Sequence, residues 1–219
     1  MSHKLRDTRI FAKLLGACNV RRCTLMRFVA RLSIGFLFMG ILALFASRPV
    51  LAQSVAVPAD IQAELLSKLE GYDRNFPARA GDIANVLILV KPGNTKSALS
   101  AAEMRSALAR VDRIGGLPHQ EVVVPFESAD ALAARCRSDR IAVVYLTPGF
   151  DSDLDALRTS LSTANVLTLA ALTDYVAQGA VLGFELESGK PKIVINLEQA
   201  RRQGVNFPPD LVRLMRVYR

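Results

Sequence analysis

Short, uninterrupted runs of apolar residues, separated by segments with helical spacing, most constrain how this chain can fold. The runs cover residues 86–90, 122–124, 141–146 and 166–169. Apolar residues at helical spacing occupy residues 58–70, 101–111 and 154–161. Strands that are apolar at every position are typical of parallel sheets covered by helices on both faces. The pattern therefore predicts an α/β fold, a three-layer sandwich around a mainly parallel sheet.

The last quarter of the chain has a different pattern, which indicates a β-hairpin. Apolar and polar residues alternate over residues 182–187 and again over residues 192–197. A two-residue turn at Ser188-Gly189 sets the register of the two strands. This register pairs Phe184 with Ile193, Leu182 with Ile195 and Glu185 with Lys192. Each pair agrees in polarity, as a ribbon with one buried face requires.

Two short terminal helices are predicted after the hairpin. Asn196 can cap the first helix, with Gln199 at its third position, and Gly204 stands where a left-handed residue ends a helix. The second helix is expected after Pro208-Pro209. Its apolar face would consist of Leu211, Leu214, Met215 and Tyr218, flanked by Arg213, Arg216 and Arg219.

Residues 1–52 have the features of a secretory signal peptide. Arg27 and Arg31 precede an apolar run over residues 32–46, and Val50 and Ala52 stand three and one positions before a cleavage point. We expect cleavage after Ala52, a single α/β domain over residues 53–219 and a periplasmic location. Met26 is an alternative start, because it would begin a leader of normal length. An uncleaved anchor is a second alternative, although the run is shorter than the roughly 20 residues of a spanning helix.

The charge of the chain is concentrated in this leader. Residues 1–52 hold nine of the 28 basic side chains and one of the 20 acidic side chains, which leaves 19 of each in residues 53–219. A neutral domain offers no electrostatic attraction to nucleic acid or to an anionic membrane surface. We therefore expect no nucleic-acid partner, and no embedding in the membrane once the leader is removed.

Reactive side chains are scarce after residue 52. His119 is the only histidine there, in a loop predicted to be solvated, and Cys136 is the only cysteine. A two-histidine metal site is therefore excluded. Asp151, Asp153 and Asp155 suit the first turn of a helix better than a calcium loop, which would need a glycine after the third aspartate. We expect no catalytic residue, metal or cofactor, and no enzymatic activity. Cys136 is either a buried, inert thiol or the site of an intermolecular disulfide.

The C-terminal third carries a more specific pattern. It consists of residues 179–184, residues 189–197 with the sequence Gly-Lys-Pro-Lys-Ile-Val-Ile-Asn-Leu, residues 200–204 with Ala-Arg-Arg-Gln-Gly, and the leucine-containing residues 211–214. This pattern resembles the YfiR/HmsC-like family. The resemblance implies a periplasmic α/β protein, often a homodimer, that represses a membrane-bound diguanylate cyclase by binding its periplasmic sensor domain.

The resemblance also directs attention to particular residues. Members of the family tie their stability to redox state through disulfides, and in this chain only Cys136 remains as a redox candidate. We predict that the partner binds the hairpin and the helix that follows it, through Phe184, Glu185, Lys192, Asn196, Glu198 and Arg201. A core position for Phe184 and a capping role for Asn196 are the competing interpretations. The alternative function is that of a periplasmic solute-binding protein, with its crevice at the ends of the parallel strands. A hydrolase that uses His119 and Cys136 is a third hypothesis.

Overall fold

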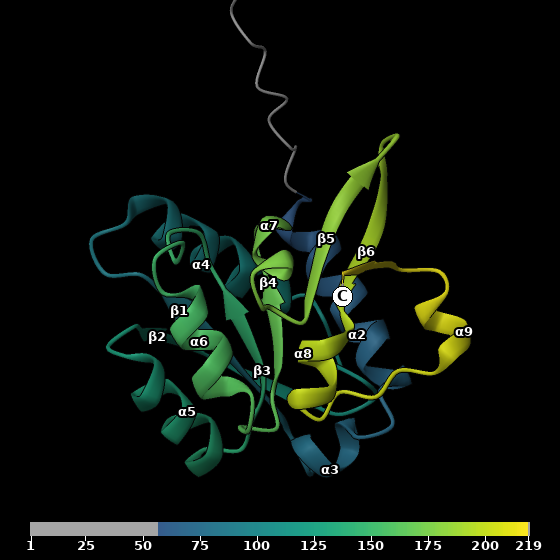
Figure 1. Ribbon diagram of the computed structural model, residues 1–219, viewed down its shortest axis with the longest axis horizontal. Coiled ribbons are helices and arrows are strands. Elements are labelled where there is room, and N and C mark those ends of the chain that lie inside the picture. The colour runs from purple at the N-terminus through teal and green to yellow at the C-terminus, as the bar shows by residue number, and fades with distance from the viewer. Residues whose placement is uncertain (1–56, 219) are drawn as a thin grey trace, which may run out of the picture. The chain divides into compact units, whose positions relative to one another are not determined.

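The computed structural model describes residues 57–218, which form an α/β sandwich of three layers around one sheet (Figure 1). The described residues contain seven strands in the spatial order β2-β1-β3-β4-β5-β6-β7. Their bounds are Ala84–Val90 (β1), His119–Pro125 (β2), Ile141–Leu146 (β3), Leu167–Ala170 (β4), Leu182–Glu187 (β5), Lys190–Asn196 (β6) and Arg216–Tyr218 (β7). Only β5 and β6 pair antiparallel. The predicted fold class is confirmed.

Helices cover both faces of the sheet. They are Ala59–Leu69 (α2), Phe76–Ala80 (α3), Thr95–Leu108 (α4), Ala129–Ser138 (α5), Leu154–Leu161 (α6), Asp174–Ala177 (α7), Leu197–Arg202 (α8) and Pro209–Val212 (α9), with a 3-10 turn, η1, over Glu70–Tyr72. One apolar cluster joins one face of the sheet to α2 and α4, and a second joins the other face to α5, α6 and α7. Residues 1–52, with the predicted leader and cleavage point, lie outside the described residues. Among residues 57–218, no helix is both long enough and apolar enough to span a membrane.

The central strands show why uninterrupted apolar runs belong to this fold. In β1, Val86 and Ile88 pack into the first cluster, whereas Leu87 and Leu89 pack into the second. All six residues of β3 are also buried, some in the first cluster and some in the second. Because successive side chains of a strand point to opposite faces, a strand covered on both sides needs an apolar residue at every position.

The second apolar run lies in a different environment from the one predicted. Strand β2 is at the edge of the sheet, and Val122 and Val123 remain 38% and 40% exposed. The expectation of a solvated loop at His119 is also wrong, because this residue begins β2. Its ring is almost buried, and its Nε2 atom lies 2.7 Å from the carbonyl oxygen of Val111.

The hairpin has the predicted register. Phe184 pairs with Ile193, and Glu185 pairs with Lys192. Ser188 and Gly189 both have positive φ angles, 52° and 76°, as the commonest two-residue hairpin turn requires. Figure 1 shows the tip of this hairpin extending beyond the rest of the sheet.

The last predicted helix is shorter than expected. Helix α9 ends at Val212, and residues 216–218 form β7, which pairs parallel with β6. Leu214 is 68% exposed, whereas Met215 is buried, so the two do not share one apolar face. The outer edge of β6 offers backbone hydrogen-bonding groups, and a strand satisfies them where a helix would not.

Candidate partner-binding surface

The crevice that a solute-binding protein of this topology would use is filled by the protein's own side chains. The strand order reverses between β1 and β3, and such a switch point is where open α/β sheets bind ligands. Here the Nζ atom of Lys91 lies 2.6 Å from Asp153 Oδ2. The same ammonium group lies 5.1 and 5.6 Å from the ring centroids of Phe126 and Phe150, which stack edge to face. The ion pair and the cation–π contacts hold these side chains in the crevice, so they occupy the space that a ligand would need.

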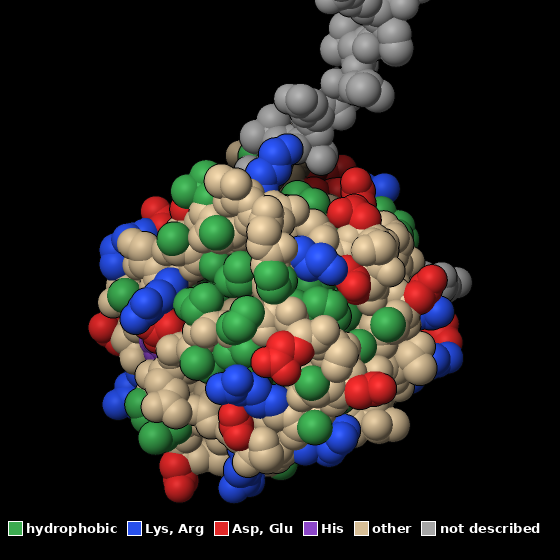
Figure 2. Space-filling model, turned by 90° about the vertical axis from the view of Figure 1, so that its left-hand side faces the viewer, with side chains coloured by type: hydrophobic (Ala, Val, Ile, Leu, Met, Phe, Trp, Pro, Cys, Tyr) green, Lys and Arg blue, Asp and Glu red, His purple; other side chains and the backbone are tan. Residues whose placement is uncertain are grey.

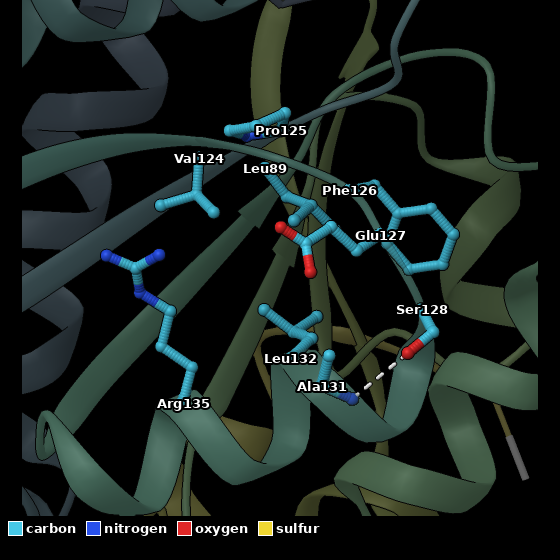
Figure 3. A pocket seen from close by; sticks show the side chains of 9 residues that line it. All are labelled: Leu89, Val124, Pro125, Phe126, Glu127, Ser128, Ala131, Leu132 and Arg135. Carbon is cyan, nitrogen blue, oxygen red and sulfur yellow. Dashed lines mark hydrogen bonds between the residues drawn. The ribbon is translucent and has the colours of Figure 1, made fainter.

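A small cavity remains beside the ring of Phe126 (Figure 3). Its volume is about 60 Å³, and its lining includes Leu89 from β1, Val124 from β2 and Leu132 from α5. Ser128 caps α5, since its hydroxyl accepts a hydrogen bond from the amide of Ala131 at 3.2 Å. Sites for small molecules usually measure roughly 300 to 1,000 Å³, so this cavity is too small for a typical solute.

A larger groove lies near the end of the chain, between α8 and α9. Its volume is about 350 Å³. Ile195, Val205 and Phe207, all buried, contribute its apolar lining, while the exposed Arg201 and Arg213 also line it. The complete lining is Ile195, Leu197, Ala200, Arg201, Val205, Asn206, Phe207, Pro209, Val212 and Arg213. An apolar floor beside exposed arginines is a common composition for a protein-binding surface.

Contacts with the N-terminal part of the domain fix the loop that forms one wall of this groove. Asp73 Oδ1 accepts a hydrogen bond from the amide of Asn206 at 2.8 Å, and the amide of Arg74 donates to the carbonyl of Asn206 at 3.1 Å. Asn75 Nδ2 donates to the carbonyl of Gly204 at 2.8 Å. The groove is therefore positioned by residues more than a hundred positions earlier in the chain.

Asp73 belongs to a buried charge cluster behind this loop. One nitrogen of the Arg79 guanidinium lies 2.8 Å from Glu70 Oε2 and 2.6 Å from Asp73 Oδ2, and all three side chains are at most 1% exposed. Burial raises the pKa of Glu70 to about 7, against the opposing effect of Arg79, because loss of water disfavours the charged carboxylate. Glu70 Oε1 and two nitrogens of Arg79 have no hydrogen-bond partner among the described residues.

The structure places the predicted hairpin residues in different environments. Phe184 is 3% exposed and belongs to the core, in agreement with its competing interpretation. Glu185 is partly exposed, and its two carboxylate oxygens lie 3.0 and 2.9 Å from Nη1 of Arg216 in β7. Lys192 is partly exposed beside Glu185.

The predicted residues of the following helix have separate roles. The side chain of Asn196 caps α8 by accepting a hydrogen bond from the amide of Gln199 at 3.0 Å. Its Nδ2 atom also donates to the carbonyl of Val176 at 3.0 Å. Glu198 is exposed and paired with Arg202. Arg201 is the one predicted partner-binding residue that lines the groove, and it forms no ion pair within residues 57–218.

Sequence reasoning missed most of the groove. Arg213 was expected on the flank of a longer helix. The sequence separation of Arg201 and Arg213 does not indicate that both residues line one groove. Asn206 and Phe207 lie in a loop whose position depends on Asp73 and Arg74. No local pattern could have indicated these contacts, because they join distant parts of the chain.

Cys136 lies away from this groove, in the apolar cluster beneath α5, α6 and α7. Its thiol forms no disulfide within residues 57–218, and the residue is buried, with 2% of its surface exposed. Burial raises the pKa of its thiol to about 12, so the reactive thiolate is scarce at neutral pH. Within residues 57–218, no three His, Cys, Asp or Glu side chains are grouped so as to hold a metal ion.

Comparison with known proteins gives one family and several structural neighbours. The model of the YfiR/HmsC-like family matches residues 59–216. No curated protein matches the chain at a significant level. Among solved structures, a conserved domain protein from Vibrio cholerae is similar, with 14% identity, a TM-score of 0.51, and coverage of 76% of this chain and 61% of that one.

Two further structures show the same fold. One is the ABC domain in complex with L-Trp from Streptococcus pneumonia, with 14% identity, a TM-score of 0.51, and coverage of 74% of this chain and 62% of that one. The other is CD0873 in its ligand-free, open form, a substrate binding protein with adhesive properties from Clostridium difficile, with 11% identity, a TM-score of 0.53, and coverage of 74% and 60%. This chain thus spans about three fifths of the length of the structures that it matches. At such low identity the likeness establishes a shared fold alone.

Proposed function

The chain belongs to the YfiR/HmsC-like family, and on that premise we propose that it is a periplasmic regulatory protein. It represses a membrane-bound diguanylate cyclase, or a similar sensor, by binding the sensor's periplasmic domain. The observation that carries this proposal is the groove between α8 and α9, which combines an apolar floor with two exposed arginines. The filled crevice at the strand ends supports protein recognition over solute binding.

The groove suits a segment of a partner protein that carries an apolar side chain and an acidic side chain. Val205 and Phe207 would contact the apolar side chain, and Arg201 and Arg213 would pair with the acidic one. Arginine can bind a carboxylate through two parallel hydrogen bonds, so it adds orientation as well as attraction. In this proposal the exposed part of the hairpin, including Lys192 and Glu185, lies at the rim of the same interface.

The location of the protein is part of the proposal. Cleavage after Ala52 would release a domain that begins at Gln53. Mass spectrometry of the protein purified from a periplasmic extract should give the mass of residues 53–219. A protein recovered only from the cytosol, with residues 1–52 still attached, would contradict both the location and the regulatory role.

Charge reversal in the groove tests the binding surface. The variant Arg201→Glu with Arg213→Glu should fail to lower cellular cyclic-di-GMP in a host strain that lacks this gene, because both proposed carboxylate contacts become repulsive. The matched control is Arg137→Glu, an exposed arginine of α5 that forms no ion pair within the described residues. It should lower cyclic-di-GMP as the wild-type protein does.

The level of each variant in the periplasmic extract must be measured alongside. A groove variant that is present at the wild-type level and still represses would show that the partner binds elsewhere. Lys192→Glu tests the hairpin separately. If the hairpin lies only at the rim, this substitution should weaken repression less than the groove variant does.

A further inference from the structure

Charged side chains of the domain lie mainly at its surface. Figure 2 shows this for the side of the molecule that carries β2, where acidic and basic side chains surround a patch of apolar ones. Within residues 57–218, only Glu70, Asp73 and Arg79 are charged residues that are buried. Because burial of a charge costs free energy, such a cluster needs compensating contacts.

The contacts within this cluster compensate its charges only in part. A single nitrogen of Arg79 serves both carboxylates, at 2.8 Å from Glu70 and 2.6 Å from Asp73. The other oxygen of Glu70 and two further nitrogens of Arg79 find no hydrogen-bond partner in the described part of the chain. The two acids therefore compete for one cation. A proton on Glu70 ends this competition and leaves Asp73 and Arg79 as a neutral pair.

The segments around Glu70 place no further charge against it. Loop 114–117, in which Gly115 packs closely against Phe76 and the backbone of Glu70, contains no ionisable residue. Loop 203–207 contains none either, and strand β3, on which α3 packs, has no acidic or basic residue. Asp73 and Arg79 are thus the charged groups that face Glu70. The charged residues of α2 and of the adjoining loops are all exposed: Glu64, Lys68, Arg74, Asp112 and Arg113.

Asp73 connects this cluster to the groove between α8 and α9. Its Oδ2 atom contacts Arg79, whereas its Oδ1 atom accepts hydrogen bonds from the amides of Asn75 at 3.1 Å and Asn206 at 2.8 Å. Asn206 lines the groove together with its neighbours Val205 and Phe207. One carboxylate therefore joins a titratable group in the interior to a wall of the groove.

We propose that the proton on Glu70 controls how firmly Asp73 holds this wall, so that partner binding in the groove is stronger at acidic than at alkaline pH. This regulation rests on the function proposed above. With Glu70 protonated, Arg79 pairs with Asp73 alone, and Asp73 keeps its bonds to both amides. With Glu70 ionised, its charge repels Asp73. Movement of Asp73 away from Glu70 then weakens the bond to Asn206 and loosens the wall.

The ordered wall is the form that holds the proton more tightly. Burial raises the pKa of Glu70 to about 7 in the folded protein, so this group changes charge near neutral pH. A loosened wall admits water to the cluster, which lowers the pKa of Glu70 toward its solvated value of 4.5. Acidic pH therefore favours the ordered wall. Each pKa unit that separates the two forms changes their ratio by up to about tenfold across the titration.

Nuclear magnetic resonance of the protein purified after expression of the full chain tests the coupling. The amide of Asn206 donates to Asp73, so its chemical shift should change in a step with a midpoint near pH 7. The amide of Ala131 is an internal control, because it donates to the neutral hydroxyl of Ser128 and should show no such step. No step at Asn206 in the wild-type protein would overturn the proposal.

Two variants assign that step to one residue. Glu70→Gln has no proton to lose near pH 7, so the step at Asn206 should disappear. Glu64→Gln is the matched control and should keep the step, since Glu64 is exposed and pairs with Lys68. A step that Glu70→Gln retains would also overturn the proposal.

Repression at two values of external pH tests the regulation, because the periplasm follows the pH of the medium. Cyclic-di-GMP is measured in the host strain that lacks this gene, with and without each protein at the same pH. The wild-type protein should repress at least about threefold more strongly at pH 6 than at pH 8. Glu70→Gln should repress alike at both values, and Glu64→Gln should behave as the wild-type protein does.

The two assays separate failure of this inference from failure of the proposed function. Equal repression by the wild-type protein at pH 6 and pH 8 would overturn the regulation and leave the repressor role intact. No repression at either pH, with the protein present in the periplasm, would instead reject the repressor role. The Asn206 titration uses purified protein alone, so it decides the coupling between Glu70 and the groove in either case.

Discussion

At the residue scale, the buried cluster of Glu70, Asp73 and Arg79 is the feature with the clearest energetic consequence. Two carboxylates share one guanidinium, and none of the three side chains is more than 1% exposed. When both acids are ionised, the cluster keeps an uncompensated negative charge out of water, which is costly. Protonation of Glu70 relieves that cost, and this is the reason for its raised pKa.

We predict that stability falls as pH rises because of Glu70. The pKa of this carboxyl is about 7 in the folded protein, against 4.5 when it is solvated. The folded state therefore holds its proton more tightly than the unfolded state does. The resulting stabilisation is complete below the solvated pKa and is lost as pH rises to the folded pKa. Urea unfolding between about pH 5 and about pH 8 should show this loss.

Two variants isolate the contribution of Glu70. Glu70→Gln cannot titrate, so its free energy of unfolding should change less with pH than that of the wild-type protein. Glu64→Gln is the matched control, since Glu64 is exposed and its pKa is lowered by Lys68. The prediction fails if the pH profiles of the wild-type protein and Glu70→Gln run parallel.

Cys136 gives a second prediction at this scale. The thiol is buried, and its pKa of about 12 leaves little thiolate at neutral pH. The native protein should therefore react with iodoacetamide far more slowly than the protein in guanidinium chloride, and a non-reducing gel should show no disulfide-linked dimer. Rapid labelling of the native protein would show that Cys136 is accessible, and it would support the hypothesis that Cys136 is a redox site.

At the element scale, Asn196 joins two secondary-structure elements through the two atoms of its amide. The oxygen caps α8, and the nitrogen bonds to the carbonyl of Val176 at the end of α7. The sequence predicted the cap from the position of Asn196 at the end of the hairpin, three residues before Gln199. The bond to Val176 was not predictable, because it depends on where α7 lies relative to β6.

Replacement of Asn196 should separate these two contributions. Asn196→Ala removes both bonds and should lower the free energy of unfolding by about 1 to 3 kcal/mol. Asn196→Asp keeps an oxygen that can cap the helix and loses only the donor to Val176, so it should cost less. Chemical denaturation of both variants measures the difference. Equal losses would mean that the cap contributes little.

At the scale of the whole molecule, residues that follow three of the parallel strands pack against one another at the ends of those strands. Phe150 follows β3, is fully buried, and stacks edge to face on Phe126, which follows β2. Lys91, which follows β1, lies over both rings. These contacts occupy the position where related topologies hold a ligand, so they serve stability here.

Truncation of these rings should show that role. Phe150→Ala should lower the free energy of unfolding by about 3 to 5 kcal/mol, because it opens a cavity in the core. Phe126→Ala should cost less, since Phe126 is partly exposed. Thermal unfolding of the two variants provides the comparison. A small loss in Phe150→Ala would indicate that the crevice can open and would favour a ligand at this site.

The sequence by itself determined the features that depend on a local pattern. The apolar runs at residues 86–90 and 141–146 indicated buried parallel strands, and the alternation after residue 182 fixed the hairpin register. Asn196 and Gly204 marked the start and end of α8. These features follow from side-chain periodicity and backbone preference, which neighbouring residues specify.

Only the tertiary structure decided the features that depend on distant neighbours. It placed β2 at an edge, where apolar Val122 and Val123 stay exposed, and it turned residues 216–218 into a strand beside β6. It also formed the groove of Arg201 and Arg213 by anchoring Asn206 to Asp73. The periodicity of apolar residues indicates which side chains favour burial. The pairing of segments that are distant in sequence decides which of these side chains are covered and which remain available for a partner.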